Sequence, residues 1–320
     1  MLKRICVALA LLVAPAVSAQ EAYPARPVRI VVAFPAGGSV DIVARLVGAE
    51  LARRLGQPFV VDNRSGAGGN VGTDFVAKAQ PDGYTLLMAG AGPIVTSPAL
   101  NPELPYNPQR DLAPVTLIAL QANVLIVHPS VPATSVAEFI ALARAQPGRI
   151  NYATAGIGSS QHLAAEGFAL RTGISMTHIP YRGGAPGLSD LIAGQVQAMF
   201  ETIPTALQAV RGGQVRALGV TTLNRSPAMP ELATVAESGV PGYEARAWLG
   251  LLGPAALPPA IVATLDREVR AIVAGPAITA RLVDLGLEIT PSTPASFRAF
   301  LDAELAANRA LVAAANITLN

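Results

Sequence analysis

Two glycine-rich turns hold the residues best suited to bind a ligand. Gly37–Gly38 follows a β-branched stretch and precedes a helical pattern, and Gly156–Ser160 is placed in the same way later in the chain. Such turns expose backbone N–H groups at the positive end of a helix, which suits a carboxylate or a phosphate. Glycine is also the default residue of a tight turn, so each turn alone has a structural interpretation. The occurrence of two such turns favours binding.

Nucleotide and metal chemistry have little support in the sequence. Neither Ser65–Asn70 nor Gly156–Gln161 has the third glycine of a dinucleotide fingerprint, and no phosphate-binding Gly-Lys-Ser/Thr loop is present. His128, His162 and His178 do not have the i, i+4 spacing of a zinc pair. We therefore predict no cofactor and no metal.

A serine hydrolase is the alternative from another class of protein. Ser159 and Ser160 do not stand in a Gly-x-Ser-x-Gly motif. Ser159 and His162 are nevertheless close in sequence, and sequence order neither supports nor excludes a triad assembled in space. A hydrolase would turn over an ester or an amide, whereas a binding protein would release its ligand unchanged.

Four more side chains are candidates for contact with a ligand or for packing. Tyr181 offers a hydrogen-bond donor and Arg182 a bidentate partner for a carboxylate, although both also suit a surface turn. Glu201 follows an apolar run, where it either accepts from a ligand amine or hydroxyl or caps the helix at Thr205. Trp248 is predicted to pack where the chain crosses between domains, because a large aromatic ring buries much surface.

The elements that position these residues alternate between strands and helices. The first unit has predicted strands at 28–34, 59–61 and 85–88, with Ser39 as the expected N-cap of a helix. That helix has one apolar face at four-residue spacing, formed by Val43, Val47, Leu51 and Leu55. Strands that alternate with helices predict a parallel, doubly wound sheet, and open sheets of this kind bind ligands at their carboxyl edge.

The same alternation restarts near residue 124 and builds a second unit. Strands are expected at 124–127, 150–153, 196–200 and 215–220, and a helix is expected from about Ser160. Residues 223–243 are rich in Pro, Gly and Ser and predict a long surface connection. Two helices are expected to end the chain, one after Pro258–Pro259 and one after Thr293–Pro294.

These patterns predict an α/β protein of two lobes, each a doubly wound sheet, joined by two crossing segments. The crossings are placed near Ala122 and Ala247, so that residues 20–123 and 247–320 form the first lobe and residues 124–246 the second. A cleft between two lobes is a natural ligand site, and a two-segment hinge permits closure.

The N-terminus predicts export. Lys3 and Arg4 precede an apolar run that ends at Val17-Ser18-Ala19, the pattern of a cleaved signal peptide at 1–19. Removing it leaves 21 basic and 21 acidic residues and no cysteine, since Cys6 is the only one. A chain without a basic excess is not expected to bind nucleic acid, and a chain without cysteine relies on its core rather than on disulfides.

The motifs together resemble those of the tripartite tricarboxylate transporter receptor family, the Bug proteins. The resemblance covers the whole mature chain in order, on the segments 34–45, 63–70, 81–87, 158–164, 180–184, 216–221 and 230–242 and on Trp248. It implies a type II periplasmic-binding-protein fold, no catalysis and a periplasmic location. It also implies a monomer that captures a small carboxylate and passes it to the permease subunits of a tripartite transporter, or to a sensor.

The resemblance also implies which residues hold the ligand. One carboxylate is expected at the first strand–helix turn and at the glycine-serine turn of the second lobe, and the other end of the ligand near residues 89–93 and Glu201. With Tyr181, the predicted ligand-binding residues are Phe34, Pro35, Ala36, Gly37, Gly38, Ala89, Gly90, Ala91, Thr154, Gly156, Gly158, Ser159, His162, Tyr181 and Glu201. The position of Glu201 more often carries Asp in this family, so its longer side chain is expected to narrow or redirect the distal pocket.

Overall fold

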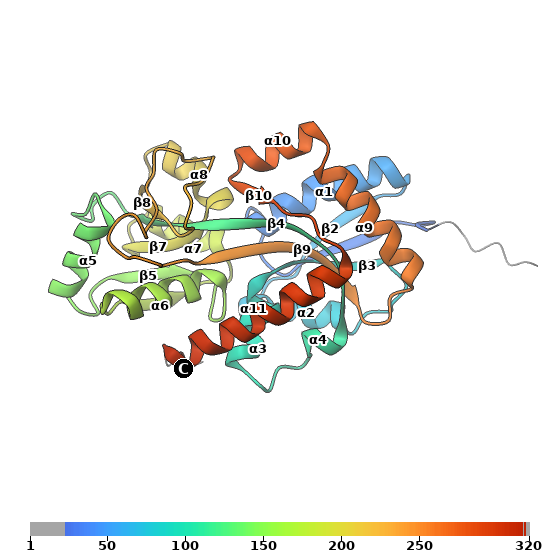
Figure 1. The fold of residues 1–320 in the computed structure, drawn as a ribbon, viewed down its shortest axis with the longest axis horizontal. Helices are drawn as coiled ribbons and strands as arrows, with labels where there is room; N and C mark the ends of the chain where they lie inside the picture. The colour runs from blue at the N-terminus through green and yellow to red at the C-terminus, as the bar shows by residue number, and fades with distance from the viewer. Residues whose placement is uncertain (1–22, 316, 318–320) are drawn as a thin grey trace, which may run out of the picture.

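The computed structural model describes residues 23–315 and 317. The predicted signal peptide at 1–19 lies outside these residues. Figure 1 shows two groups of helices and strands, one at each end of the molecule, bridged by the long strands β4 and β9. None of the described helices is long and apolar enough to cross a membrane.

The first group, which we call the first lobe, forms around three parallel strands. β1 (Val28–Val32) pairs with β2 (Phe59–Asn63) on one side and with β3 (Thr85–Gly90) on the other. Alternate residues of β1 lie in different apolar clusters, Ile30 on one face and Val31 on the other. Helices therefore cover both faces of this sheet. The helices that belong to this lobe before the crossing are α1 (Ser39–Leu55), α2 (Asn70–Ala77), α3 (Ser97–Leu100) and α4 (Pro108–Asp111), with short turns at η1 (Ala67–Gly69) and η2 (Gly92–Thr96).

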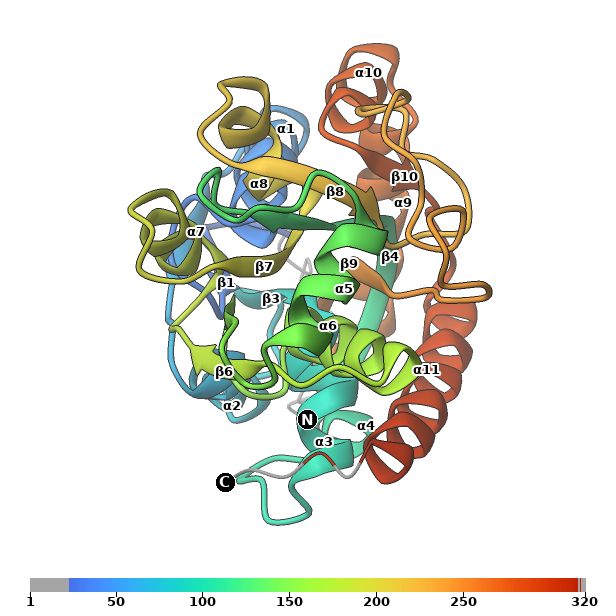
Figure 2. The same ribbon diagram turned by 90° about the vertical axis from the view of Figure 1, so that its left-hand side faces the viewer.

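The second lobe repeats the arrangement. Strand β5 (Asn151–Thr154) pairs in parallel with β6 (Thr177–Pro180) and with β7 (Ala198–Thr202). Strand β8 (Arg216–Val220) lies on the other side of β4. The helices are α5 (Val136–Ala145), α6 (Ser160–Thr172), α7 (Gly184–Ile192) and α8 (Ile203–Arg211). Figure 2 looks onto this lobe, with α5 and α6 toward the viewer.

Two long antiparallel strands connect the lobes. β4 (Leu112–Val127) pairs with β9 (Arg246–Pro254) as far as Ala122, and from Asn123 onward it pairs with β7 and β8. Only the last four residues of β4 were predicted as a strand, because the part before them contains Pro114 and polar residues that break the apolar run. The parallel sheets predicted from the strand–helix alternation are thus joined by antiparallel pairs.

The C-terminal part returns to the first lobe. It contains α9 (Pro259–Val273), α10 (Pro276–Asp284), β10 (Leu287–Ile289) and α11 (Pro294–Ala314). The two predicted helices are α9 and α11, whereas α10 and β10 between them were not predicted. Helix α10 was missed because only Leu282 on it is fully buried, which leaves no apolar stripe to detect. Figures 1 and 2 show α11 running along the side of the molecule until it contacts α6 of the second lobe.

The connection at 223–243 contains no helix or strand, as predicted, but it is more than a surface segment. Val235, Val240 and Tyr243 are buried in the core of the second lobe. The Tyr243 hydroxyl donates a hydrogen bond of 2.8 Å to the carbonyl of Ala164. These three side chains fix the connection against α6 and the sheet.

Gly250 of β9 tests how tightly the first lobe is packed. A β-carbon at this position would lie 2.3 Å from Cζ of Phe297 and 3.1 Å from the carbonyl oxygen of Thr116. Phe297 is fully buried and cannot move aside freely. We expect Gly250→Ala to lower the free energy of unfolding by about 1–3 kcal/mol, measured by urea denaturation.

Gly167→Ala is the matched control. Gly167 is in the middle of α6, and a β-carbon there would meet only Leu311 at an ordinary 3.8 Å. Alanine favours a helix over glycine by about 0.5–1 kcal/mol, so this variant should be neutral or more stable. Equal stability of the two variants would contradict the tight packing of Phe297 on β9.

Candidate functional site

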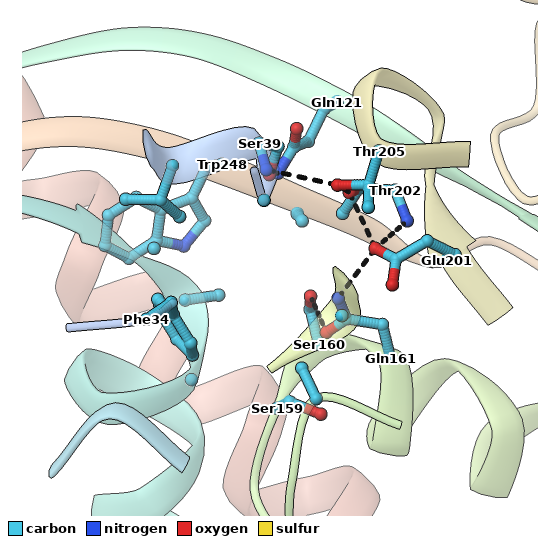
Figure 3. Close-up of a pocket in the computed structure, with 18 residues that line it drawn as sticks. Phe34, Ser39, Gln121, Ser159, Ser160, Gln161, Glu201, Thr202, Thr205 and Trp248 are labelled. Carbon is cyan, nitrogen blue, oxygen red and sulfur yellow. Dashed lines mark hydrogen bonds between the residues drawn. The ribbon is translucent and has the colours of Figure 1, made fainter. Parts of the chain in front are cut away.

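A small cavity lies between the two lobes, against the crossing strands. Its volume is about 40 Å³, far below the roughly 300 Å³ or more of typical ligand pockets. The lobes are therefore closed on each other in this structure. The lining residues are Phe34, Gly38, Ser39, Val40, Gly90, Ala91, Gly92, Gln121, Ala155, Ser159, Ser160, Gln161, Gly184, Glu201, Thr202, Thr205, Ala247 and Trp248; ten of them are labelled in Figure 3.

Four helices begin at this cavity. Helix α1 starts at Ser39 in the first lobe, and α6, α7 and α8 start at Ser160, Gly184 and Ile203 in the second. The first backbone N–H groups of a helix have no partner inside the helix, and the helix dipole places partial positive charge there. No Lys or Arg lines the cavity. Its attraction for an anion therefore comes from backbone dipoles rather than from cationic side chains.

The local sequence explains how α1 and α6 reach the cavity. Gly38 is the extended N-cap of α1, so Ser39, the predicted N-cap, is the first helical residue. Its hydroxyl instead accepts a hydrogen bond of 3.2 Å from the side-chain amide of Gln121. Ser159 is the N-cap of α6, and its hydroxyl accepts from the backbone N–H of His162 at 3.2 Å.

Three buried polar atoms on the cavity lining have no partner within the described chain. They are the indole Nε1 of Trp248, the amide Oε1 of Gln121 and the carboxyl Oε2 of Glu201. Figure 3 shows Trp248 and Glu201 on opposite sides of the cavity. Buried polar atoms are nearly always hydrogen-bonded in folded proteins. Both donor and acceptor positions on this lining are thus open to a ligand.

Glu201 is the one ionisable side chain that lines the cavity, and it is fully buried. Its Oε1 accepts from the backbone N–H and the hydroxyl of Thr202, at 2.7 and 2.8 Å, and from the side-chain amide of Gln161 at 3.1 Å. Burial raises the pKa of this carboxyl more than these hydrogen bonds lower it. Both uses proposed from the sequence are compatible with this geometry, since Oε1 caps α8 and Oε2, which lies beside Gly184, has no partner among the described residues.

The first turn is fixed from behind by Asp41. The Asp41 carboxylate accepts from the backbone N–H of Gly37 at 3.0 Å, from Arg45 and from the side-chain amide of Asn63 at 2.9 Å. The same Asn63 amide donates to the carbonyl of Phe34. Burial acts to raise the pKa of Asp41, but the hydrogen bonds from Arg45, Gly37 and Asn63 outweigh it and hold the pKa below its ordinary value.

The structure brings some of the predicted site residues to the cavity and places the others around it. The six that line it are Phe34, Gly38, Gly90, Ala91, Ser159 and Glu201. The nine that do not are Pro35, Ala36, Gly37, Ala89, Thr154, Gly156, Gly158, His162 and Tyr181. Ala36 and Gly37 are exposed, and Ala89 is buried in the core of the first lobe.

Several of these nine residues make the contact between the lobes. Pro35 of the first lobe packs against Gly183, where a β-carbon would lie 2.4 Å from Cδ of Pro35. Gly156 packs against Gly68 of the first lobe, and a β-carbon on Gly156 would lie 3.3 Å from Cα of Gly68. The Tyr181 hydroxyl donates to Asp190 at 2.7 Å, which raises the Tyr181 pKa to about 12 together with the larger effect of burial. This hydroxyl is therefore engaged with Asp190 in the closed structure.

His162 belongs to a column of stacked rings next to the glycine-serine turn at 156–160, and Thr154 contacts this column. His162 stacks on His178 with ring centroids 4.3 Å apart, and His178 stacks on Tyr152. The Thr154 hydroxyl lies 2.7 Å from Nε2 of His178 and accepts from the N–H of Gly156 at 3.1 Å. Nδ1 of His162 accepts from the N–H of Gly158. The column thus supports the glycine-serine turn.

The predicted hydrolase pair is not assembled. The Ser159 hydroxyl meets the backbone of His162, whereas the His162 ring meets the backbone of Gly158. A serine nucleophile requires a hydrogen bond from its hydroxyl to the base. The pair instead stabilises the start of α6.

Sequence reasoning missed most of the residues on the crossing strands and helix starts. They are Ser39, Val40, Gln121, Ala155, Ser160, Gln161, Gly184, Thr202, Thr205, Ala247 and Trp248, whereas Gly92, which also lines the cavity, lies within the predicted segment 89–93. The helix starts at Ser39 and Ser160 were available as a signal. Trp248 packs edge-to-face on Phe297, as its predicted packing role requires, and it also lines the cavity.

The fold and the cavity between two lobes are those of a solute-binding protein. The model of the tripartite tricarboxylate transporter family receptors matches residues 43–317. The chain belongs to this family of periplasmic binding proteins, which are not enzymes.

Curated relatives and solved structures agree. The protein BugT of Bordetella pertussis is 38% identical over 286 residues, which cover 89% of this chain and 88% of BugT. A Rhodopseudomonas palustris protein solved with adipate is 38% identical, with a TM-score of 0.91 and coverage of 92% of this chain and 99% of that protein. MatC of the same organism, solved with malate, is 33% identical, with a TM-score of 0.87 and coverage of 91% and 100%.

The buried histidines predict acid sensitivity. Burial lowers the pKa of His162 from 6.5 to about 4. The unfolded chain therefore takes up a proton before the folded one does, so the stabilisation is complete above pH 6.5 and is lost as the pH falls toward 4. We expect urea denaturation to show a loss on the order of 3 kcal/mol from this group over that range.

Two variants make this test specific. His162→Gln should reduce the pH dependence of stability between neutral and acidic pH, and the remaining dependence comes from His178, whose pKa burial also lowers to about 4. His128→Gln is the control, because His128 is only half-buried and bonds to Ser130 away from the cavity. An unchanged pH profile in His162→Gln would show that another group causes the acid sensitivity.

Proposed function

We propose that this receptor captures a small carboxylate between its lobes and delivers it to the membrane permease of a tripartite transporter. The observation that carries the proposal is the convergence of four helix N-termini on one cavity between the lobes without a cationic side chain. Backbone N–H groups and the indole N–H of Trp248 are donors suited to carboxylate oxygens. The adipate and malate complexes of the two similar proteins support this class of ligand.

The proposal includes how the ligand enters. We assign residues 20–123 with 247–320 to one lobe and residues 124–246 to the other, and this division is supported by the change of pairing partner of β4 after Ala122, from β9 to β7. Bending of β4 and β9 opens the cleft, and closure on the ligand buries it. The closed form then presents one joined surface to the permease. Residues 1–19 direct export to the periplasm before this function begins.

A thermal-shift screen tests the ligand class. The protein without residues 1–19 is heated with mono-, di- and tricarboxylates, amino acids, aromatic acids and neutral sugars. A ligand that binds only the folded state at about 100 times its Kd adds about 2.7 kcal/mol of stability. We expect acids to raise the Tm and to be recovered unchanged. Stabilisation by sugars or cations with none by acids would contradict the proposal.

Thr205→Val tests closure. The backbone N–H of Ser39 in the first lobe donates to the Thr205 hydroxyl of the second lobe at 3.1 Å. Valine keeps the shape but removes this contact, and one hydrogen bond contributes about 0.5–1.5 kcal/mol. We expect the Kd for the acid found in the screen to rise about three- to tenfold, measured by calorimetry.

Thr177→Val serves as the control for this change. Thr177 is the exposed first residue of β6, away from the cavity, and its hydroxyl donates to the carbonyl of Gly148. It should bind the acid with unchanged Kd. If Thr205→Val also leaves the Kd unchanged, the contact between Ser39 and Thr205 does not belong to the ligand-bound state.

A further inference from the structure

The charge state of Glu201 determines what the far end of the ligand can be. This carboxyl shares the cavity with the ligand, and one of its oxygens, Oε2, is buried without a partner. An ionised Glu201, which is fully buried, and a ligand carboxylate would place two anions in one cavity that no Lys or Arg lines. Such a pair is unfavourable in a low-dielectric interior, and one proton shared with the site relieves it.

The side chains around Glu201 offer no compensating charge. Gln161 of α6 and Thr202 at the start of α8 contact it, Gly184 of α7 lies against Oε2, and Val124 of β4 is its cross-strand neighbour. All of these residues are uncharged, and Thr205 and Ser39, which face the same cavity, are too.

The titratable groups on the same elements are engaged elsewhere. On α6, His162 is stacked on His178, and Glu166 accepts from the Tyr152 hydroxyl. On α7, Asp190 accepts from Tyr181, and on α1 Asp41 pairs with Arg45. On β4 no residue is charged. The proton on the Glu201 carboxyl is therefore the only charge adjustment that the described cavity provides.

We propose that Glu201 is a specificity-determining residue that acts as a neutral acid: in the closed receptor it keeps its proton on Oε2 and donates it to an oxygen at the far end of the ligand. Oε1 is already occupied by three donors, which leaves Oε2 as the atom that carries the proton. The inference rests on the proposed carboxylate ligand and specifies it further. The ligand class is a carboxylate with a second acceptor, such as a dicarboxylate or an oxo acid, rather than an amino acid whose ammonium faces Glu201.

The geometry also explains the glycine opposite this oxygen. A β-carbon on Gly184 would lie 2.2 Å from Oε2 of Glu201. Any larger residue would push the carboxyl away from its present position. Gly184 therefore supports the neutral acid sterically without providing a charge or a hydrogen-bonding side chain.

If Glu201 is ionised in the open receptor and protonated in the closed one, binding of the anionic ligand is accompanied by uptake of a proton. The Kd should then rise with pH, at most about tenfold per pH unit. The probes are succinate, β-alanine and adipate. β-Alanine carries an ammonium where succinate carries its second carboxylate, and adipate is a longer dicarboxylate. Their Kd values are measured by calorimetry between pH 5 and pH 8 with the wild-type protein and with Glu201→Gln.

Glutamine at position 201 imitates the protonated acid, because its oxygen can accept from Thr202 and Gln161 while its amide donates to the ligand. We expect Glu201→Gln to bind a dicarboxylate within about threefold of the wild type at low pH and to lose the pH dependence that the wild type shows. Neither protein should bind β-alanine more tightly than succinate. Glu103→Gln, on the exposed surface, is the control and should keep the wild-type pH dependence.

Infrared spectroscopy gives a readout that does not depend on affinity. The C=O stretch of a protonated carboxyl should be present with saturating succinate or adipate and absent from Glu201→Gln. Loss of binding of more than about a hundredfold in Glu201→Gln, absence of this band, or tighter binding of β-alanine would each overturn the inference. If no acid binds but the band is present with the lobes closed, the proposed function fails while the protonated state of Glu201 stands.

Discussion

Backbone N–H groups at the starts of helices are the constraint on which this molecule is organised. Parallel strands deliver the chain to helix starts at the carboxyl edge of each sheet, and the crossing strands turn the two edges toward each other. An N–H group buried without a partner is costly. The closed lobes satisfy part of this demand themselves, through the contact between Ser39 and Thr205 and the capping by Ser159. The N–H groups at the helix starts that remain without a partner can bind an acceptor on a ligand.

Much of the fold could be predicted from the sequence because both lobes repeat one local pattern. The β-branched run at β1, the apolar run at β3 and the glycine turns after β1 and β5 are local signals, and they located the starts of α1 and α6 to within one residue. The elements that were missed have weak local signals. Helix α10 has little buried surface, and the first part of β4 is strand only because β9 and β10 pair with it.

The candidate site was harder to predict for a related reason. A turn residue such as Gly156 or Gly158 can be recognised from sequence, yet whether it faces the ligand or the opposite lobe depends on closure, which the sequence does not encode locally. Gln121 and Trp248 come from the two crossing strands, 127 positions apart in the chain, and only the pairing of β4 with β9 brings them together. Glu201 was proposed from the sequence because it follows an apolar run. The different surroundings of its two carboxyl oxygens could be seen only from the positions of Thr202 and Gln161.

The division of the first lobe between both ends of the chain has a consequence for biogenesis. The core of this lobe is closed on one face by Leu265 and Val269 of α9 and on the other by Phe297 and Leu301 of α11. A nascent chain that stops before these helices leaves the β1–β3 sheet covered only by α1 on one face and by α2 and η2 on the other, whereas the second lobe lies within one continuous segment. The first lobe thus completes its core last, and a truncated polypeptide exposes apolar surface that proteases and chaperones recognise. Complete and truncated chains therefore differ in the apolar surface that they expose.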